Sequence, residues 1–233
     1  EFATSPSLRN GIFDLLSSAK MASDANVKLL DFTIELFKDN GLFSDYYGYH
    51  NVDHELEVTY VTLLSGIHAM HDGYLTLDDL NYLYASALLH DFDPEKAMDK
   101  PHEKNVIQFI SKNKTIQKLL TEANLDQNLI CALISRTVYP WKGDIITKTN
   151  KLINNYFLKS KIKNDKKQQE HFSNLGHFLS VADRIGGYSL GDFQKAMEMA
   201  KMNAHSSSWH PAFIVRRSVG FFEDMLNSEP DMC

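Results

Sequence analysis

Residues 76–91, TLDDLNYLYASALLHD, decide the fold class of this chain. Thr76 and Asp79 have the spacing of a capping box, in which two side chains satisfy the first backbone N–H groups of a helix. After them, apolar residues recur every three or four positions as far as His90, which predicts a helix with a buried face. The segment therefore predicts a core helix that ends on a histidine and an aspartate.

The same helical period extends over most of the chain. Ser23-Asp24 offers an N-cap to a further apolar stripe, and Asn40-Gly41 offers a stop. Other helices are expected over 51–65, 102–112, 115–122, 125–138 and 144–160, with a long one over 166–185 that ends at Gly186-Gly187. No convincing strand, repeat or Pro/Ser-rich linker interrupts this pattern. The sequence predicts an all-α, single-domain orthogonal helical bundle over residues 6–233.

Composition limits the function classes. Of the 233 residues, 43% are hydrophobic, which is ample for a buried core. The net charge of −6 argues against a general nucleic-acid binder, which normally carries a basic face. Eight lysines within 142–167 are interpreted as a solvated face and a charged loop. We expect no nucleic-acid partner.

The chain has no sign of secretion or membrane insertion. With only two cysteines, Cys131 and Cys233, a disulfide is not expected. No apolar run approaches the ~18 residues of a membrane span, so we expect a cytoplasmic protein without a membrane partner. Residues 1–5 lack a starting Met and resemble a cloning scar. A homodimer, or a place within a longer multidomain protein, is compatible with this sequence.

Four residues form the strongest chemical pattern: His54, His90, Asp91 and Asp183. Two neutral imidazoles and two carboxylates suit a divalent metal that must also hold water and phosphate oxygens. His50 lies four residues before His54, on the same helical face. Each residue alone is more often structural, because a single histidine in an apolar helix is usually a core or edge residue. Their joint occurrence favours a metal site.

The order of the motifs resembles a known family. YHNVDH at 49–54, HDFD at 90–93 and AD at 182–183 are similar to Y-H-N-x-x-H, H-D-x-D-H-P-G and A-D in the catalytic region of class I cyclic-nucleotide phosphodiesterases. That family belongs to the HD-domain superfamily of metal-dependent phosphohydrolases. The resemblance covers 46–110 well and the region after 175 more loosely. It implies a helical bundle of the HD-domain/phosphodiesterase type.

The resemblance also implies roles for these residues. His54, His90, Asp91 and Asp183 would hold a tighter metal, usually zinc. Asp91 would bridge to a second divalent ion, usually magnesium or manganese, with iron as a further alternative. By this resemblance, Asp91 would also be a catalytic residue. His50 would be the general acid that protonates the leaving alkoxide of a small, cyclic nucleotide substrate.

One departure from the family pattern concerns the second metal. The third histidine of H-D-x-D-H is replaced by Pro94 in this chain, which leaves the outer support of that metal in question. Asp93, Asp99 and His102 are the candidates for this outer support, the last two by matching an acid and a histidine that the family places after the loop.

Another departure concerns the nucleotide base. Residues 218–222, SVGFF, resemble the Q-V-G-F-I of the family. Phe221 would then stack on the base, although ordinary core packing explains it equally well. Ser218 replaces the glutamine that grips the purine edge, which weakens any base selectivity. Arg136 is a candidate phosphate ligand, although an arginine at a helix C-terminus commonly pairs with the helix dipole.

Four functions remain open at this point. The leading one is a metal-dependent cyclic-nucleotide phosphodiesterase, which the YHNVDH context favours. An HD-type nucleotidase or phosphomonoesterase needs only the four ligands. A diiron oxygenase needs two more histidines between the His-Asp pair and the final Asp, and the available ones are poorly spaced. A nucleotide-binding sensor with a degenerate site is the alternative without catalysis.

Overall fold

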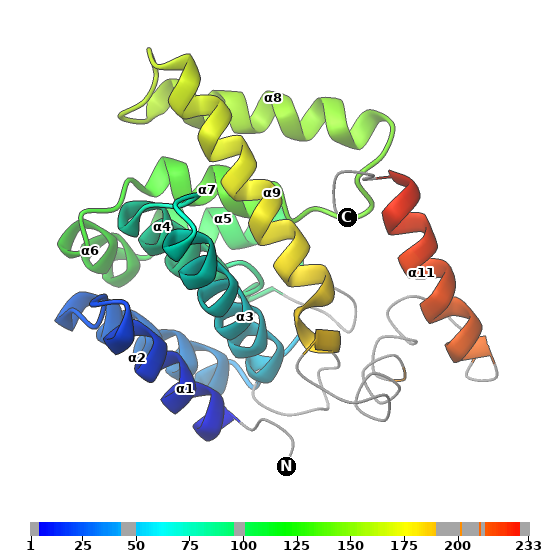
Figure 1. Cartoon of the computed structure of the whole chain (residues 1–233), viewed down its shortest axis with the longest axis horizontal. Helices are drawn as coiled ribbons and strands as arrows, with labels where there is room; N and C mark the ends of the chain where they lie inside the picture. Colours follow the sequence, from blue (N-terminus) through cyan, green and yellow to red (C-terminus); the bar gives the residue numbers. More distant parts are fainter. Residues whose placement is uncertain are drawn as a thin grey trace.

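The computed structural model describes residues 5–42, 50–95, 101–189, 201, 210 and 213–228. Every regular element within these residues is a helix (Figure 1), so the predicted all-α fold class is confirmed. The labelled helices are α1 (Ser5–Ser18), α2 (Asp24–Asp39), α3 (Val52–His71), α4 (Leu77–Ala87), α5 (Glu103–Lys112), α6 (Lys114–Glu122), α7 (Gln127–Ser135), α8 (Asp144–Lys159), α9 (Lys166–Ser189) and α11 (Ile214–Ser228).

Helix α3 lies at the centre of the packing. It contacts α1, α4 and α9, while α7 contacts α4, α8 and α9. Figure 1 shows α3, α4 and α9 side by side, and these three helices or their ends carry the candidate ligands. Residues on all sides of α3 are buried, as expected for a helix surrounded by others.

Local capping signals are present as predicted. The Thr76 side chain accepts from the backbone N–H of Asp79, and the Asp79 carboxylate accepts from the backbone N–H of Thr76. The Ser23 side chain caps α2, and Asn40 ends it. Such caps are readable from sequence because they satisfy N–H groups only two or three residues away.

The predicted stop at Gly186-Gly187 is wrong. Helix α9 continues through both glycines to Ser189. A Cβ atom placed on Gly186 would lie 3.6 Å from Val58 Cα on α3, so this position lies where α9 packs closely against α3. Tertiary packing of this kind overrides the low helix propensity of glycine.

Three other predicted boundaries differ from the structure. The expected helix over 51–65 continues to His71, since Gly66 packs against Leu80 of α4 instead of ending the helix. The expected helix over 125–138 is shorter: α7 ends at Ser135, and Arg136 is its C-cap residue. The helix expected to reach His90 ends at Ala87, which changes how the candidate ligands His90 and Asp91 are presented.

Asp79→Ala should destabilise the fold more than the loss of the α4 helix cap alone would. Besides capping α4, the Asp79 carboxylate lies 2.7 Å from Nε2 of His171 on α9. We expect a loss of about 2–3 kcal/mol in the free energy of unfolding, from one cap and one hydrogen bond. Denaturant unfolding measures it, with the exposed Asp78→Ala as the control. Equal effects at the two positions would contradict this role.

Among the described residues, none of the helices combines the length and apolar character needed to cross a membrane.

Candidate metal centre

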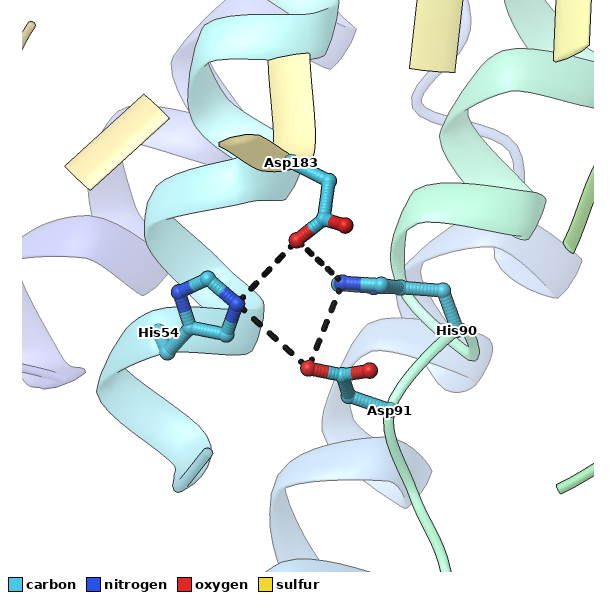
Figure 2. A group of neighbouring side chains, drawn as sticks. All are labelled: His54, His90, Asp91 and Asp183. Atoms are coloured by element: carbon cyan, nitrogen blue, oxygen red, sulfur yellow. Dashed lines mark hydrogen bonds and ion pairs between the residues drawn. The ribbon is translucent and has the colours of Figure 1, made fainter. Parts of the chain in front are cut away.

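Four side chains from three parts of the fold meet at one point. His54 comes from α3, His90 and Asp91 from the turn after α4, and Asp183 from α9. One donor atom of each lies within 4.8 Å of the others, and Figure 2 shows all four pointing inward. The structure thus brings together the four residues predicted as metal ligands.

The contacts alternate between imidazole nitrogens and carboxylate oxygens. His54 Nε2 lies 3.3 Å from Asp183 Oδ1 and 3.4 Å from Asp91 Oδ2. His90 Nε2 lies 3.3 Å and 3.5 Å from the same two oxygens. Both histidines therefore present Nε2 to the centre, and each carboxylate presents one oxygen.

Mutual pairing shifts the proton equilibria of these groups. Burial lowers the pKa of His54, but hydrogen bonds to Asp183 and Asp91 outweigh it and raise the pKa to about 9. Burial likewise opposes the charge on His90, while the negative charges of Asp91 and Glu55 hold its pKa well above the ordinary value. Burial raises the pKa of Asp91, but the charges of His90 and His50, together with hydrogen bonds to His50 and His54, hold it well below the ordinary value. The metal-free cluster is a buried set of ion pairs.

The N-terminus of α3 positions His54. The Asn51 side chain accepts from the backbone N–H groups of Asp53 and His54 at 3.0 Å and 3.1 Å. This N-cap begins the helix at Val52, so that His54 lies in its first turn, with a side chain only 2% exposed. The asparagine of YHNVDH is therefore a structural cap that fixes where the first candidate ligand lies.

His90 and Asp91 lie beyond the end of α4, and not in its last turn as predicted. Neighbouring helical positions point about 100° apart, whereas these two side chains face one cavity because the chain has left the helix. The Ala87 carbonyl, at the helix C-terminus, accepts from His90 Nδ1 at 2.7 Å. That bond orients the ring with Nε2 toward the cluster.

His50 lies at the rim of the cluster. Its Nδ1 is 2.8 Å from Asp91 Oδ2, and its side chain is 19% exposed against 0% for His90. The rings of His50 and His54 are edge to face, with centroids 5.4 Å apart. The predicted catalytic histidine therefore contacts a predicted ligand from the more accessible side.

Glu55 is a component of the site that sequence reasoning missed. Its side chain is fully buried and contacts both members of the His90–Asp91 pair. Burial raises the pKa of Glu55, while the charge of His90 opposes this effect. An acid immediately after a ligand histidine, inside an apolar helix, was the available signal.

Asp93, Asp99 and His102 were predicted to lie around the ligands of a second metal, and the structure describes two of the three. Asp93 is buried and accepts from the backbone N–H groups of Glu95 and His102 at 2.8 Å and 2.9 Å, and from the Asn105 side chain. The exposed His102 is the N-cap residue of α5. Asp93 thus organises the chain after the cluster, and Asp99 lies outside the described residues. Support of a second metal stays a prediction for all three.

Arg136 links the end of α7 to α9 through its side chain. Its guanidinium donates to Ser180 Oγ at 3.1 Å, lies 2.9 Å from His177 Nδ1, and stacks 3.7 Å from the Trp141 ring centroid. Ser180 and His177 belong to α9, so Arg136 holds the end of α7 against the helix that carries Asp183. Its predicted contact with a phosphate stays a prediction.

The region around Phe221 contains an aromatic pair. The Phe221 ring lies 5.2 Å from the ring of Tyr139, centroid to centroid. Arg184 directly follows Asp183 in the sequence. Its guanidinium carbon lies 5.5 Å from the centroid of the Tyr139 ring. The side chain of Ser218 lies outside the described residues. Base recognition by Phe221 and Ser218 stays a prediction, and Tyr139 is a neighbour that the sequence pattern did not single out.

The donor set fits a divalent cation. Two imidazole nitrogens and two carboxylate oxygens, all buried or nearly so, can replace their mutual ion pairs by bonds to one ion. Mixed nitrogen and oxygen donors are compatible with zinc, manganese or iron. His54, His90, Asp91 and Asp183 are the residues that would hold it.

The metal-free protein should lose stability as the pH rises. The pKa of His54 is raised from 6.5 to about 9 in the fold. Its pairing therefore contributes fully below about pH 6.5 and is lost as the pH passes through about 9. Denaturant midpoints measured across this range should fall for the metal-free protein. The metal-loaded protein should not follow this fall, because a ligand imidazole carries no proton on its donor nitrogen. A flat profile without metal would contradict the pairing.

Comparisons of the chain with protein-family models, with curated proteins and with solved structures find no match. A functional conclusion therefore depends on the geometry of the cluster and on the sequence motifs.

Proposed function

We propose that this chain is a metal-dependent phosphohydrolase of the HD-domain type that hydrolyses the phosphodiester of a small, cyclic nucleotide. The observation that carries the proposal is His50, held 2.8 Å from Asp91 at the accessible rim of a four-donor cluster. A metal site alone has many uses. A histidine contacting one of its ligands from the open side adds a proton donor where a bond to phosphorus is broken.

The reaction needs a nucleophile and an acid. Divalent cations held by His54, His90, Asp91 and Asp183 would generate a nucleophile from water near neutral pH and neutralise charge on the phosphate. Attack at phosphorus forms one P–O bond and breaks the bond to the ester oxygen. That leaving oxygen needs a proton, since an alkoxide is a poor leaving group.

His50 would supply this proton. Its Nδ1 donates to Asp91 Oδ2, which leaves the transferable proton on Nε2. A histidine is suited to the role because imidazole changes charge within the physiological pH range. After the reaction, the proton is regained from solvent water.

The experiment is a hydrolysis screen of the purified chain with zinc, magnesium or manganese. Cyclic mononucleotides, cyclic dinucleotides and nucleoside monophosphates are compared, each with and without a chelator. Metal-dependent turnover of cyclic nucleotides supports the proposal. Turnover of monophosphates alone would replace it by a phosphomonoesterase, an outcome favoured by Pro94 and Ser218 in place of the family residues. Tight nucleotide binding without turnover would indicate a sensor.

A further inference from the structure

The His90–Asp91 turn is tied to helix α3 by one buried carboxylate. Glu55 follows His54 on α3, and its side chain is 0% exposed. Glu55 Oε2 lies 3.3 Å from His90 Nδ1, and Oε1 accepts from the backbone N–H of Asp91 at 3.4 Å. Each carboxylate oxygen thus faces a nitrogen of a different candidate ligand residue.

The Ala87 carbonyl and Glu55 have separable roles at His90. Ala87 O lies only 2.7 Å from His90 Nδ1, and a carbonyl can only accept, so this bond determines which ring nitrogen carries the hydrogen. An ionised Glu55 places a negative charge behind the ring, which makes Nε2 a better donor to a metal. Glu55 also adds the link to Asp91, which the Ala87 carbonyl does not provide.

The position requires a carboxylate and not simply a polar group. The backbone N–H of Asp91 donates to Oε1, and Oε2 lies beside His90 Nδ1, whose hydrogen is donated to Ala87 O. A carboxylate presents only acceptor oxygens to these two N–H groups. A glutamine has one accepting oxygen, so its amide hydrogens would face one of the two donors. Burying a carboxylate in this helix is costly, and the two contacts partly offset that cost.

We infer that Glu55 is a positioning residue. It holds His90 and Asp91 in place relative to α3, the helix that carries His54, and so sets the metal affinity of the cluster. Three of the four candidate ligands then depend on one helix, α3. Only Asp183 is positioned from α9. The inference rests on the proposed metal centre and adds a residue to which no role was assigned from the sequence.

Metal affinity of the full chain tests this role directly. Cobalt(II) or zinc is titrated against a chromophoric chelator for wild type, Glu55→Gln and Glu57→Gln. Glu57 is the matched control, since it is also buried on α3 but lies two positions along, on another side of the helix. We expect Glu55→Gln to weaken affinity about 10–100-fold. The cobalt absorption bands should also change, because the ligand geometry changes.

A purely structural role predicts a different result. In that case Glu55→Gln would lower the unfolding midpoint of the metal-free protein while its metal affinity equalled that of Glu57→Gln, and this outcome overturns the inference. If Glu55→Gln does not fold, Glu55→Asp replaces it, since the shorter carboxylate cannot reach both nitrogens. Wild-type affinity in that variant would also overturn the inference.

A second measurement needs no metal. In the metal-free protein, the Asp91 amide proton should shift and exchange faster in Glu55→Gln than in Glu57→Gln. An unchanged Asp91 amide overturns the inference. Failure of the proposed function is recognised separately, as a metal-loaded wild type that hydrolyses none of the substrates. A wild type that binds no divalent metal overturns both.

Discussion

Asp91→Ala should abolish metal binding and hydrolysis together. Asp91 Oδ2 lies within 3.5 Å of ring nitrogens from His50, His54 and His90. Its removal deletes one of four donors and half of the negative charge among them. Because contacts outside the ligand shell already change affinity 10–100-fold, we expect the loss of a ligand to exceed about 100-fold.

Metal content and turnover are measured on the same preparations. Asp91→Asn keeps the shape of the side chain but not its charge, and it should show the same loss to a smaller degree. The exposed Asp78→Ala serves as the control for the loss of an aspartate. Full metal content in Asp91→Ala would contradict the assigned centre. Full activity without metal would contradict the proposed chemistry.

His50→Ala should keep the metal and still lose turnover by about 10²–10⁴-fold, the usual contribution of a general acid. His50 is outside the group of four whose donor atoms converge, so metal content measured at saturating metal should match wild type, although the lost contact with Asp91 weakens affinity. His50→Gln should behave likewise, because it retains a donor toward Asp91 but has no titratable proton. Exposed His68 on α3, the helix that His50 precedes and, contrary to the prediction, does not join, provides the control variant His68→Ala.

The leaving group distinguishes an acid from other roles. A p-nitrophenyl phosphodiester releases a stable phenolate that needs no proton, so His50→Ala should hydrolyse it nearly as fast as wild type. An equal loss on both kinds of substrate would contradict the role of acid. Loss of metal in His50→Ala, as in Asp91→Ala, would instead make His50 a ligand.

Local features of the fold were predictable from the sequence. The Thr76–Asp79 capping box and the Ser23 cap depend on residues within three positions of each other, so short-range pattern is sufficient. The helical period was equally clear. Helix ends set by tertiary contacts were not predictable, as at Gly186, where α9 continues because it packs on α3.

The candidate ligands were predictable as residue types in order, but their presentation was not. Adjacent His90 and Asp91 face one cavity only because α4 ends at Ala87 and the chain turns. Similarly, the contacts of Arg136 with Ser180 and His177, which place it between α7 and α9, could not be read from its position at a helix end.

The sequence by itself predicted an all-helical chain and singled out four side chains as candidate metal ligands, because helical period and donor chemistry are properties of residue types and spacing. Only the tertiary structure decided that donors from 54, 90, 91 and 183 converge within 4.8 Å, and that Glu55 ties two of them to α3. Contacts between residues 36 to 93 positions apart in the chain depend on how the helices pack, and no local pattern encodes them.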